Sequence, residues 1–104
     1  MRLVAAGATV TGPAHQQEGL PNQDAMGVYG VRKGWCVSVC DGLGSRPLSH
    51  IGSKKAVNLV RESIRQGRWL PAQSTGLAVR DAWLEHFAER YRNYETTCLW
   101  AHVN

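Results

Sequence analysis

Two short β-rich stretches, joined by a polar turn, constrain the fold of this chain more than any other feature. Residues 25–31 and 35–40 are rich in β-branched and aromatic residues, and Arg32-Lys33-Gly34 separates them, which predicts a β-hairpin. The start of the first strand of a hairpin lies beside the end of the second. We therefore expect Asp24, just before the first stretch, and Asp41, just after the second, to be neighbours in space.

The segments on either side of the hairpin predict a strand, a loop and a helix. Residues 3–10 are small and partly β-branched and end in a turn, as a strand does. Residues 14–24 lack periodicity and predict a polar loop. A helix should follow the glycine-rich segment after Asp41 and stop near Gly67. Its apolar stripe consists of Ala56, Leu59, Val60 and Ile64.

A second helix and a last strand are expected in the remainder of the chain. Ser74 or Thr75 is the candidate N-cap of this helix, which should extend to Tyr91. Its apolar side chains at helical spacing are Leu77, Leu84, Phe87, Ala88 and Tyr91. Residues 96–103 are sufficiently apolar and β-branched for a strand. This order predicts an α+β fold in a single domain that spans residues 1–104.

The composition is that of a folded globular chain. Hydrophobic residues make up 43% of the 104 residues and charged residues 19%, with four tryptophans. The net charge of +4 is spread along the chain, whereas a surface built for phosphate backbones clusters its Lys and Arg residues. We therefore expect no nucleic-acid partner and keep a small nucleic-acid binder as the weakest alternative.

The cysteine count and the apolar segments bear on the cellular compartment. Three cysteines form no paired spacing, and Cys36 and Cys40 would lie roughly 13 Å apart along one strand. We expect reduced thiols. The apolar stretch at the N-terminus is too short for a membrane span or for a signal peptide. A cytoplasmic protein with no membrane partner is the expectation.

Two carboxylates at one end of a hairpin repel each other unless a positive group lies between them. A hard divalent cation with oxygen ligands, Mg²⁺ or Mn²⁺, suits Asp24 and Asp41. Gly42 lacks a Cβ, so its carbonyl can turn toward the metal, and Gln23 adds a neutral oxygen ligand. Taken alone, Asp-Gly after a strand is most often only a turn, and the specificity must come from the combination of motifs.

Four segments in this order resemble the protein phosphatase type 2C family, particularly its bacterial branch. The segments are HQQEGLPNQDA at residues 15–25, VSVCDGLGS at 37–45, SHIGSKKAV at 49–57 and TTCL at 96–99. The resemblance implies a four-layer α-β-β-α sandwich with two antiparallel sheets and a two-metal centre of Mg²⁺ or Mn²⁺. It also implies that the substrate is a phosphoserine or phosphothreonine protein, hydrolysed by a metal-activated water.

The resemblance assigns a role to each residue of the two loops. Asp24 and Asp41 would be the catalytic residues, with Asp41 bridging both metals, the Gly42 carbonyl coordinating one, and Asp24 holding a metal-bound water. Many family members have Glu at the position of Gln23 and Arg at the position of Gly19, where the arginine holds the substrate phosphate. His15, Arg46 or Lys54 are candidates to replace that arginine, and His15 and Arg46 are preferred.

The family's further metal ligands lie in Asp-Gly and Asp-Asn motifs that do not recur in these 104 residues. The resemblance therefore covers the N-terminal half of a phosphatase domain, and we expect this chain to be inactive by itself. The alternative is a non-catalytic binding or assembly module that oligomerises to cover its sheet edges.

Overall fold

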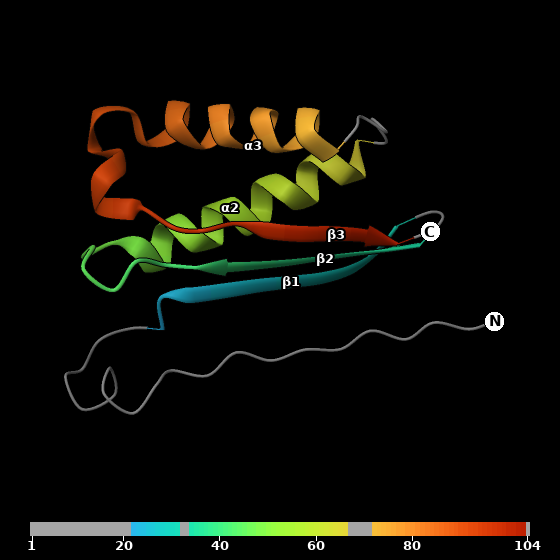
Figure 1. Cartoon of the computed structure of the whole chain (residues 1–104), viewed down its shortest axis with the longest axis horizontal. Helices are drawn as coiled ribbons and strands as arrows, with labels where there is room; N and C mark the ends of the chain where they lie inside the picture. The colour runs from blue at the N-terminus through green and yellow to red at the C-terminus, as the bar shows by residue number, and fades with distance from the viewer. Residues whose placement is uncertain (1–21, 32–33, 67–71, 104) are drawn as a thin grey trace.

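The predicted hairpin is present and forms two strands of a three-stranded antiparallel sheet (Figure 1). The computed structural model describes residues 22–31, 34–66 and 72–103. Within these ranges β1 (Asp24–Val31) pairs with β2 (Gly34–Asp41) over its full length. The last strand, β3 (Leu99–Val103), pairs with the other side of β2, so the strand order is β1-β2-β3.

The last strand is shorter than the sequence predicts. Regular pairing begins at Leu99, while Thr96 makes an isolated bridge with Gly42. Residues 96–98 therefore follow β2 without completing the ladder. The α+β class is confirmed by this sheet and the two helices on one side of it.

Helix α2 (Ser49–Arg65) lies against the hairpin, and its predicted apolar stripe faces the sheet. Ala56 and Val60 are buried, and Leu59 and Ile64 are half-buried. The strand side chains beneath the helix are small: Cys36, Ser38 and Cys40 on β2 are fully buried. Small side chains let the helix approach the sheet closely, which explains why this layer is tightly packed.

Helix α3 (Ala72–Phe87) packs on α2 and continues into the 3₁₀ helix η1 (Ala88–Tyr94). The predicted N-cap at Ser74 or Thr75 is wrong because the helix begins earlier, at Ala72, and Thr75 is a buried interior residue. The predicted end at Tyr91 is also wrong, since the α-helix stops at Phe87 and Ala88 has a positive φ of 49°. A left-handed residue at this point ends an α-helix.

The predicted apolar stripe of α3 is largely wrong as well. Phe87 is buried as predicted, but Leu77 and Leu84 are 46% and 37% exposed and Ala88 is exposed as well. Thr75 and Val79, which the predicted stripe omits, are buried instead. The Trp83 indole N–H donates a hydrogen bond to the Gly52 carbonyl of α2 at 3.0 Å. Thr75, Val79, Trp83 and Phe87 recur every four residues and form the inward-facing side of α3.

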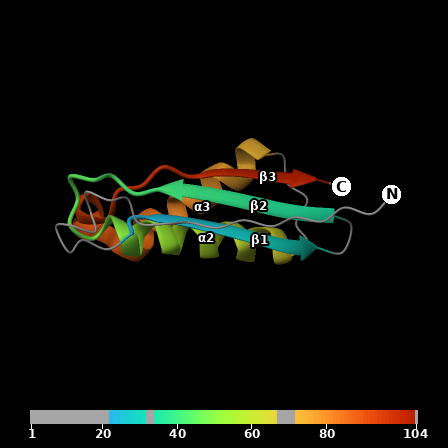
Figure 2. The same ribbon diagram turned by 90° about the horizontal axis from the view of Figure 1, so that it is seen from below.

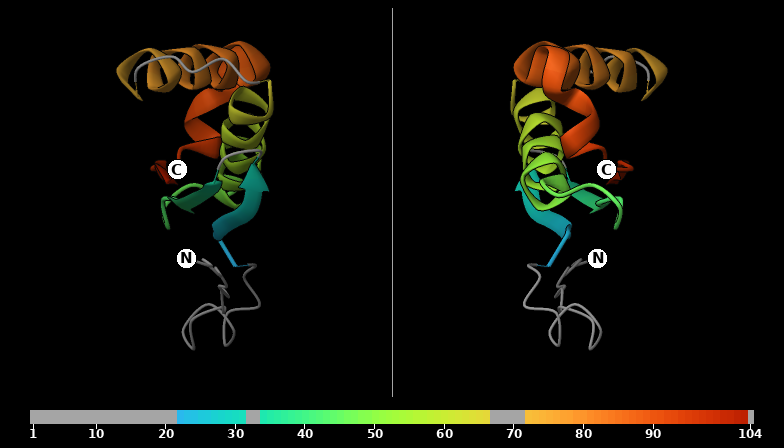
Figure 3. Two further views of the ribbon diagram at one scale, coloured as in Figure 1. Left: turned by 90° about the vertical axis from the view of Figure 1, so that its right-hand side faces the viewer. Right: turned by 90° about the vertical axis from the view of Figure 1, so that its left-hand side faces the viewer.

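Both helices lie on the same side of the sheet, as the end views in Figure 3 show. No described element covers the opposite face, which is seen from below in Figure 2. Val39 and Leu99, register partners on that face, are 49% and 73% exposed. The described part of the chain thus consists of one sheet with helices on one side.

Several sequence predictions lie outside the described residues. These are the strand at residues 3–10, most of the polar loop with His15 and Gly19, and the helix stop at Gly67. Among the helices that are described, none is long and apolar enough to cross a membrane.

Candidate functional site

Asp24 and Asp41 are direct Cα partners at the open end of the β1–β2 hairpin. Both residues are exposed. Directly opposed residues of an antiparallel pair project to the same face, with Cβ atoms about 5 Å apart. Because Cys40 faces α2, alternation along β2 directs Asp41 to the opposite face. The neighbour relation inferred from the sequence is therefore confirmed, and the two carboxylates belong to the face of the sheet away from the helices.

Thr97 holds the backbone of Asp41 in place. The Thr97 amide donates to the Asp41 carbonyl at 2.9 Å, and the Asp41 amide donates to Thr97 Oγ1 at 3.1 Å. The next residue pair, Gly42 and Thr96, forms a bridge, and the Leu43 amide donates to the Glu95 carbonyl at 3.0 Å. The segment before β3 thus fixes one side of the Asp41 loop.

Gly42 is required because no space exists for a side chain. A Cβ at this position would overlap the Gln23 carbonyl oxygen and lie 2.9 Å from Ser49. The Gly42 amide instead donates to that carbonyl at 3.1 Å. The sequence predicts that this glycine serves to free its own carbonyl, whereas the structure shows a close approach of three chain segments.

Gln23 forms hydrogen bonds both with the loop that follows Asp41 and with helix α2. Its side chain is buried, with 6% exposed, and its amide nitrogen donates to the Arg46 carbonyl at 3.3 Å. Its backbone carbonyl also accepts a hydrogen bond from the Ser53 hydroxyl at 2.7 Å. These contacts join the residue before Asp24 to the start of α2. They give Gln23 a positioning role beside the ligand role predicted for it.

Arg46 lies in the loop between β2 and α2. Its Nε is 3.6 Å from a carboxylate oxygen of Glu95, and the side chain is 40% exposed. The guanidinium is thus held at the same end of the sheet as the Asp41 loop, but it is partly neutralised by Glu95. Lys54, the other described candidate, is exposed on α2.

The site consists of two carboxylates that adjacent strands hold close together. Hard oxygen ligands of this type match the preference of Mg²⁺ and Mn²⁺. Among residues 22–31, 34–66 and 72–103, no third His, Cys, Asp or Glu joins them in a group suited to a metal ion. Within the described residues the donor set therefore fits part of a hard-metal site.

Sequence reasoning missed two residues that shape the site. The local patterns place Thr97 in a strand and Ser53 in a helix, but their side chains also form hydrogen bonds with the backbone of Asp41 and of Gln23, respectively. Their partners lie 56 and 30 residues away along the chain. No local pattern signals contacts of that separation.

Comparison with known proteins adds one finding. A family model described as protein phosphatase 2C matches residues 11–104. Neither the curated proteins nor the solved structures contain a match to the chain.

Proposed function

Since the chain belongs to the protein phosphatase 2C family, we propose that it supplies part of the active site of a metal-dependent serine/threonine phosphatase. The observation that carries this proposal is the register of β1 and β2, which pairs Asp24 with Asp41 on one face of the sheet. A family match describes ancestry, while the paired carboxylates are the feature that a metal-dependent hydrolase needs.

Asp24, Asp41 and the carbonyl of Gly42 are the residues that would hold Mg²⁺ or Mn²⁺. A bound divalent ion would supply Lewis-acid activation of water and of the phosphoryl group. The chain's own contribution is to hold the ligands in position. Thr97 forms hydrogen bonds with the backbone of Asp41, and the Gln23 carbonyl accepts one from the Gly42 amide. A ligand loop fixed in this way needs little ordering when the ion binds.

A phosphoserine or phosphothreonine protein is the proposed substrate class. Arg46 is the described candidate for holding the phosphate, with His15 as the candidate outside the described residues. Opening of the Arg46–Glu95 pair, which is 3.6 Å apart, would free the guanidinium for a bidentate contact with phosphate oxygens. Arg46 would then act by binding and orienting the substrate.

The proposed complete architecture is the four-layer sandwich of the family, with residues 1–104 forming part of one phosphatase domain. The sheet face that carries Val39 and Leu99 supports this: no described element covers it, and an apolar sheet face is stable when a second layer packs on it. The two described carboxylates need further ligands from outside the described residues. We therefore propose that the chain by itself has no substantial phosphatase activity.

A calorimetric Mn²⁺ titration of the 104-residue chain tests the site. The wild-type chain should bind Mn²⁺ weakly, Asp41→Asn should lose most of that binding, and Asp81→Asn should retain it. Asp81 is a suitable control because it is an exposed carboxylate on α3, paired with Arg80 at 3.1 Å. Equal Mn²⁺ binding by wild type and Asp41→Asn would refute the site. Robust Mn²⁺-dependent hydrolysis of p-nitrophenyl phosphate would refute the inactivity of the isolated chain.

A non-catalytic assembly module is the second candidate, and the exposed apolar face favours it. Leu99 is 73% exposed at the start of β3, opposite Val39. If a second copy covers this face, light scattering should show a dimer that Leu99→Lys converts to a monomer. A strictly monomeric wild-type chain at high concentration would remove this candidate.

A further inference from the structure

Cys40 lies on β2, and Cys98 lies directly opposite it in the segment that leads into β3. Val39 pairs with Leu99 on one side of them, and Gly42 bridges Thr96 on the other. Both pairs belong to the same antiparallel register, so Cys40 and Cys98 are opposite each other. The Thr97 amide donates to the Asp41 carbonyl in the adjacent rung. Hydrogen-bonded and non-bonded rungs alternate, which makes the cysteine rung a non-hydrogen-bonded one.

This type of rung has the spacing that a disulfide requires. Opposed Cα atoms in a non-hydrogen-bonded pair are about 4.5 Å apart, which lies within the range of about 4.4–6.8 Å found across disulfides. The two thiols also share a hydrogen bond, which lowers the pKa of Cys98 and raises that of Cys40. Cys98 packs against the core cluster that contains Cys40. All three cysteines are free thiols in this structure.

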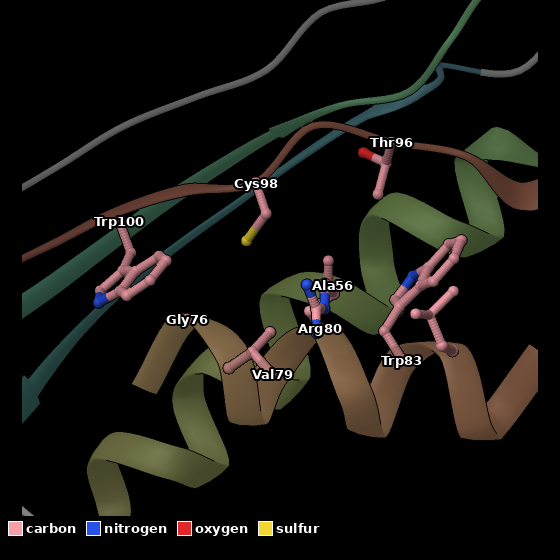
Figure 4. A pocket seen from close by; sticks show the side chains of 9 residues that line it. Ala56, Gly76, Val79, Arg80, Trp83, Thr96, Cys98 and Trp100 are labelled. Atoms are coloured by element: carbon pink, nitrogen blue, oxygen red, sulfur yellow. The ribbon is translucent and has the colours of Figure 1, made fainter. Parts of the chain in front are cut away.

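A groove of 360 Å³ between α3 and β3 gives access to Cys98. Its walls include Val79 and Trp83 of α3 and Trp100 of β3. Figure 4 shows the Cys98 side chain extending from the segment before β3 toward the helices, with its sulfur in the groove. Cys40 is fully buried behind it. A small reagent therefore reaches Cys98 first.

We propose that Cys40 and Cys98 are a redox-active pair that forms a disulfide between β2 and β3 by exchange with a low-molecular-weight disulfide. This assignment rests on the strand register and on the access to Cys98, and it does not depend on the phosphatase proposal. Since Cys40 precedes Asp41 and Cys98 follows Thr97, the bridge would tie together the two segments that hold the Asp41 loop.

The exchange proceeds in two balanced steps. The Cys98 thiolate attacks one sulfur of the small disulfide, the S–S bond of that reagent breaks, and one small thiol leaves after taking up a proton. The Cys40 sulfur, deprotonated as it reacts, then attacks the Cys98 sulfur, and the second small thiol leaves with the proton. The two protein thiols are oxidised, and one reagent disulfide is reduced to two thiols.

Incubation of the reduced 104-residue chain with glutathione disulfide, followed by acid quenching, alkylation and peptide mapping, tests the pair. We expect the number of alkylatable thiols after denaturation to fall from three to one, with the peptides of Cys40 and Cys98 linked. Cys36 should remain reduced, because it is fully buried on β2 beneath α2. Dithiothreitol should restore all three thiols.

Cys98→Ser is the matched variant and should prevent both the bridge and any glutathione adduct on Cys40. Three outcomes would overturn the proposal: retention of all three thiols, accumulation of glutathione on Cys98 with Cys40 still free, or a bridge that contains Cys36. If Cys98→Ser fails to fold, the map of the wild-type chain decides the question by itself. Cys36 and Cys40 lie on one tryptic peptide, since no Lys or Arg separates them, so fragment ions of the linked peptide must show which of these two cysteines is bridged and which is alkylated.

Discussion

Asp24 and Asp41 are register partners in the rung that closes the open end of the β1–β2 hairpin. Like charges in directly opposed positions destabilise an antiparallel pair. The two carboxylates therefore repel each other at this end of the sheet, and a cation bound between them would offset that repulsion. Removal of one of the two charges should therefore raise the stability of the metal-free chain and weaken its binding of metal.

Asp41→Asn should stabilise the metal-free chain and abolish its response to metal. Loss of one of the two opposed charges should raise the free energy of unfolding by about 0.5 kcal/mol at low ionic strength, and the gain should shrink as salt screens the repulsion. Mn²⁺ should then raise the urea midpoint of the wild type through linkage with the folded state, but not that of the variant. Destabilisation of the metal-free chain by Asp41→Asn would show that favourable contacts of the Asp41 carboxylate outweigh the repulsion.

Gly42→Ala should destabilise the fold by about 2 kcal/mol or more, because its Cβ would overlap the Gln23 carbonyl oxygen. Gly44→Ala is the matched control in the same loop. A Cβ at Gly44 meets only Gln23 Oε1, at an ordinary 3.7 Å. Urea unfolding of both variants measures the difference, and equal losses of stability would contradict the close approach at Gly42.

Trp83→Phe should weaken the attachment of α3 to α2. It removes the indole N–H that donates to the Gly52 carbonyl at 3.0 Å, at a cost of about 1 kcal/mol in the free energy of unfolding. Leu84→Ala, on an exposed position of the same helix, should cost less. Amide hydrogen exchange in α3 should accelerate in Trp83→Phe. A larger effect from Leu84→Ala would support the apolar stripe expected from the sequence instead of the observed one.

The stability of the chain should fall at alkaline pH. Burial raises the pKa of Cys36 above its ordinary 9.0, and burial together with a hydrogen bond to Cys36 raises the pKa of Tyr29 above its ordinary 10.0. Raised values in the folded state mean that the unfolded chain loses these protons first. The stabilisation is therefore complete below pH 9 and is lost as the pH rises through the folded values.

Tyr29→Phe removes the tyrosine part of this alkaline effect and, with the hydroxyl, the hydrogen bond that lowers the pKa of Cys36. The variant removes the tyrosine proton together with the hydrogen bond that its hydroxyl donates to the Val60 carbonyl at 3.3 Å. It should be less stable near pH 7, but its free energy of unfolding should decline less steeply above about pH 10. Cys40 and Cys98 are present in both chains, so their titration cancels in the comparison. An unchanged slope would show that Tyr29 ionises equally in both states.

The parts of the fold that sequence reasoning predicted correctly depend on short-range patterns. The hairpin follows from two β-rich stretches and a turn, and the helix-facing stripe of α2 follows from a 3.6-residue period around Ala56 and Val60. The apposition of Asp24 and Asp41 is a geometric consequence of the hairpin. The same reasoning predicted the second helix and the burial of Phe87 but was wrong for the bounds of α3 and for most of its apolar stripe, because apolar residues occur on more than one side of this helix.

The sequence by itself determined that Asp24 and Asp41 lie beside each other at the open end of one hairpin, because strand alternation and turn chemistry act over a few residues. Tertiary structure decided what surrounds them. The docking of Trp83 on Gly52 selects the buried face of α3, Gln23 and Ser49 occupy the space beside Gly42, and the β3 register sets Cys98 against Cys40. Each of these contacts joins segments that are separated along the chain, so its energy exists only after the sheet and the helices have assembled.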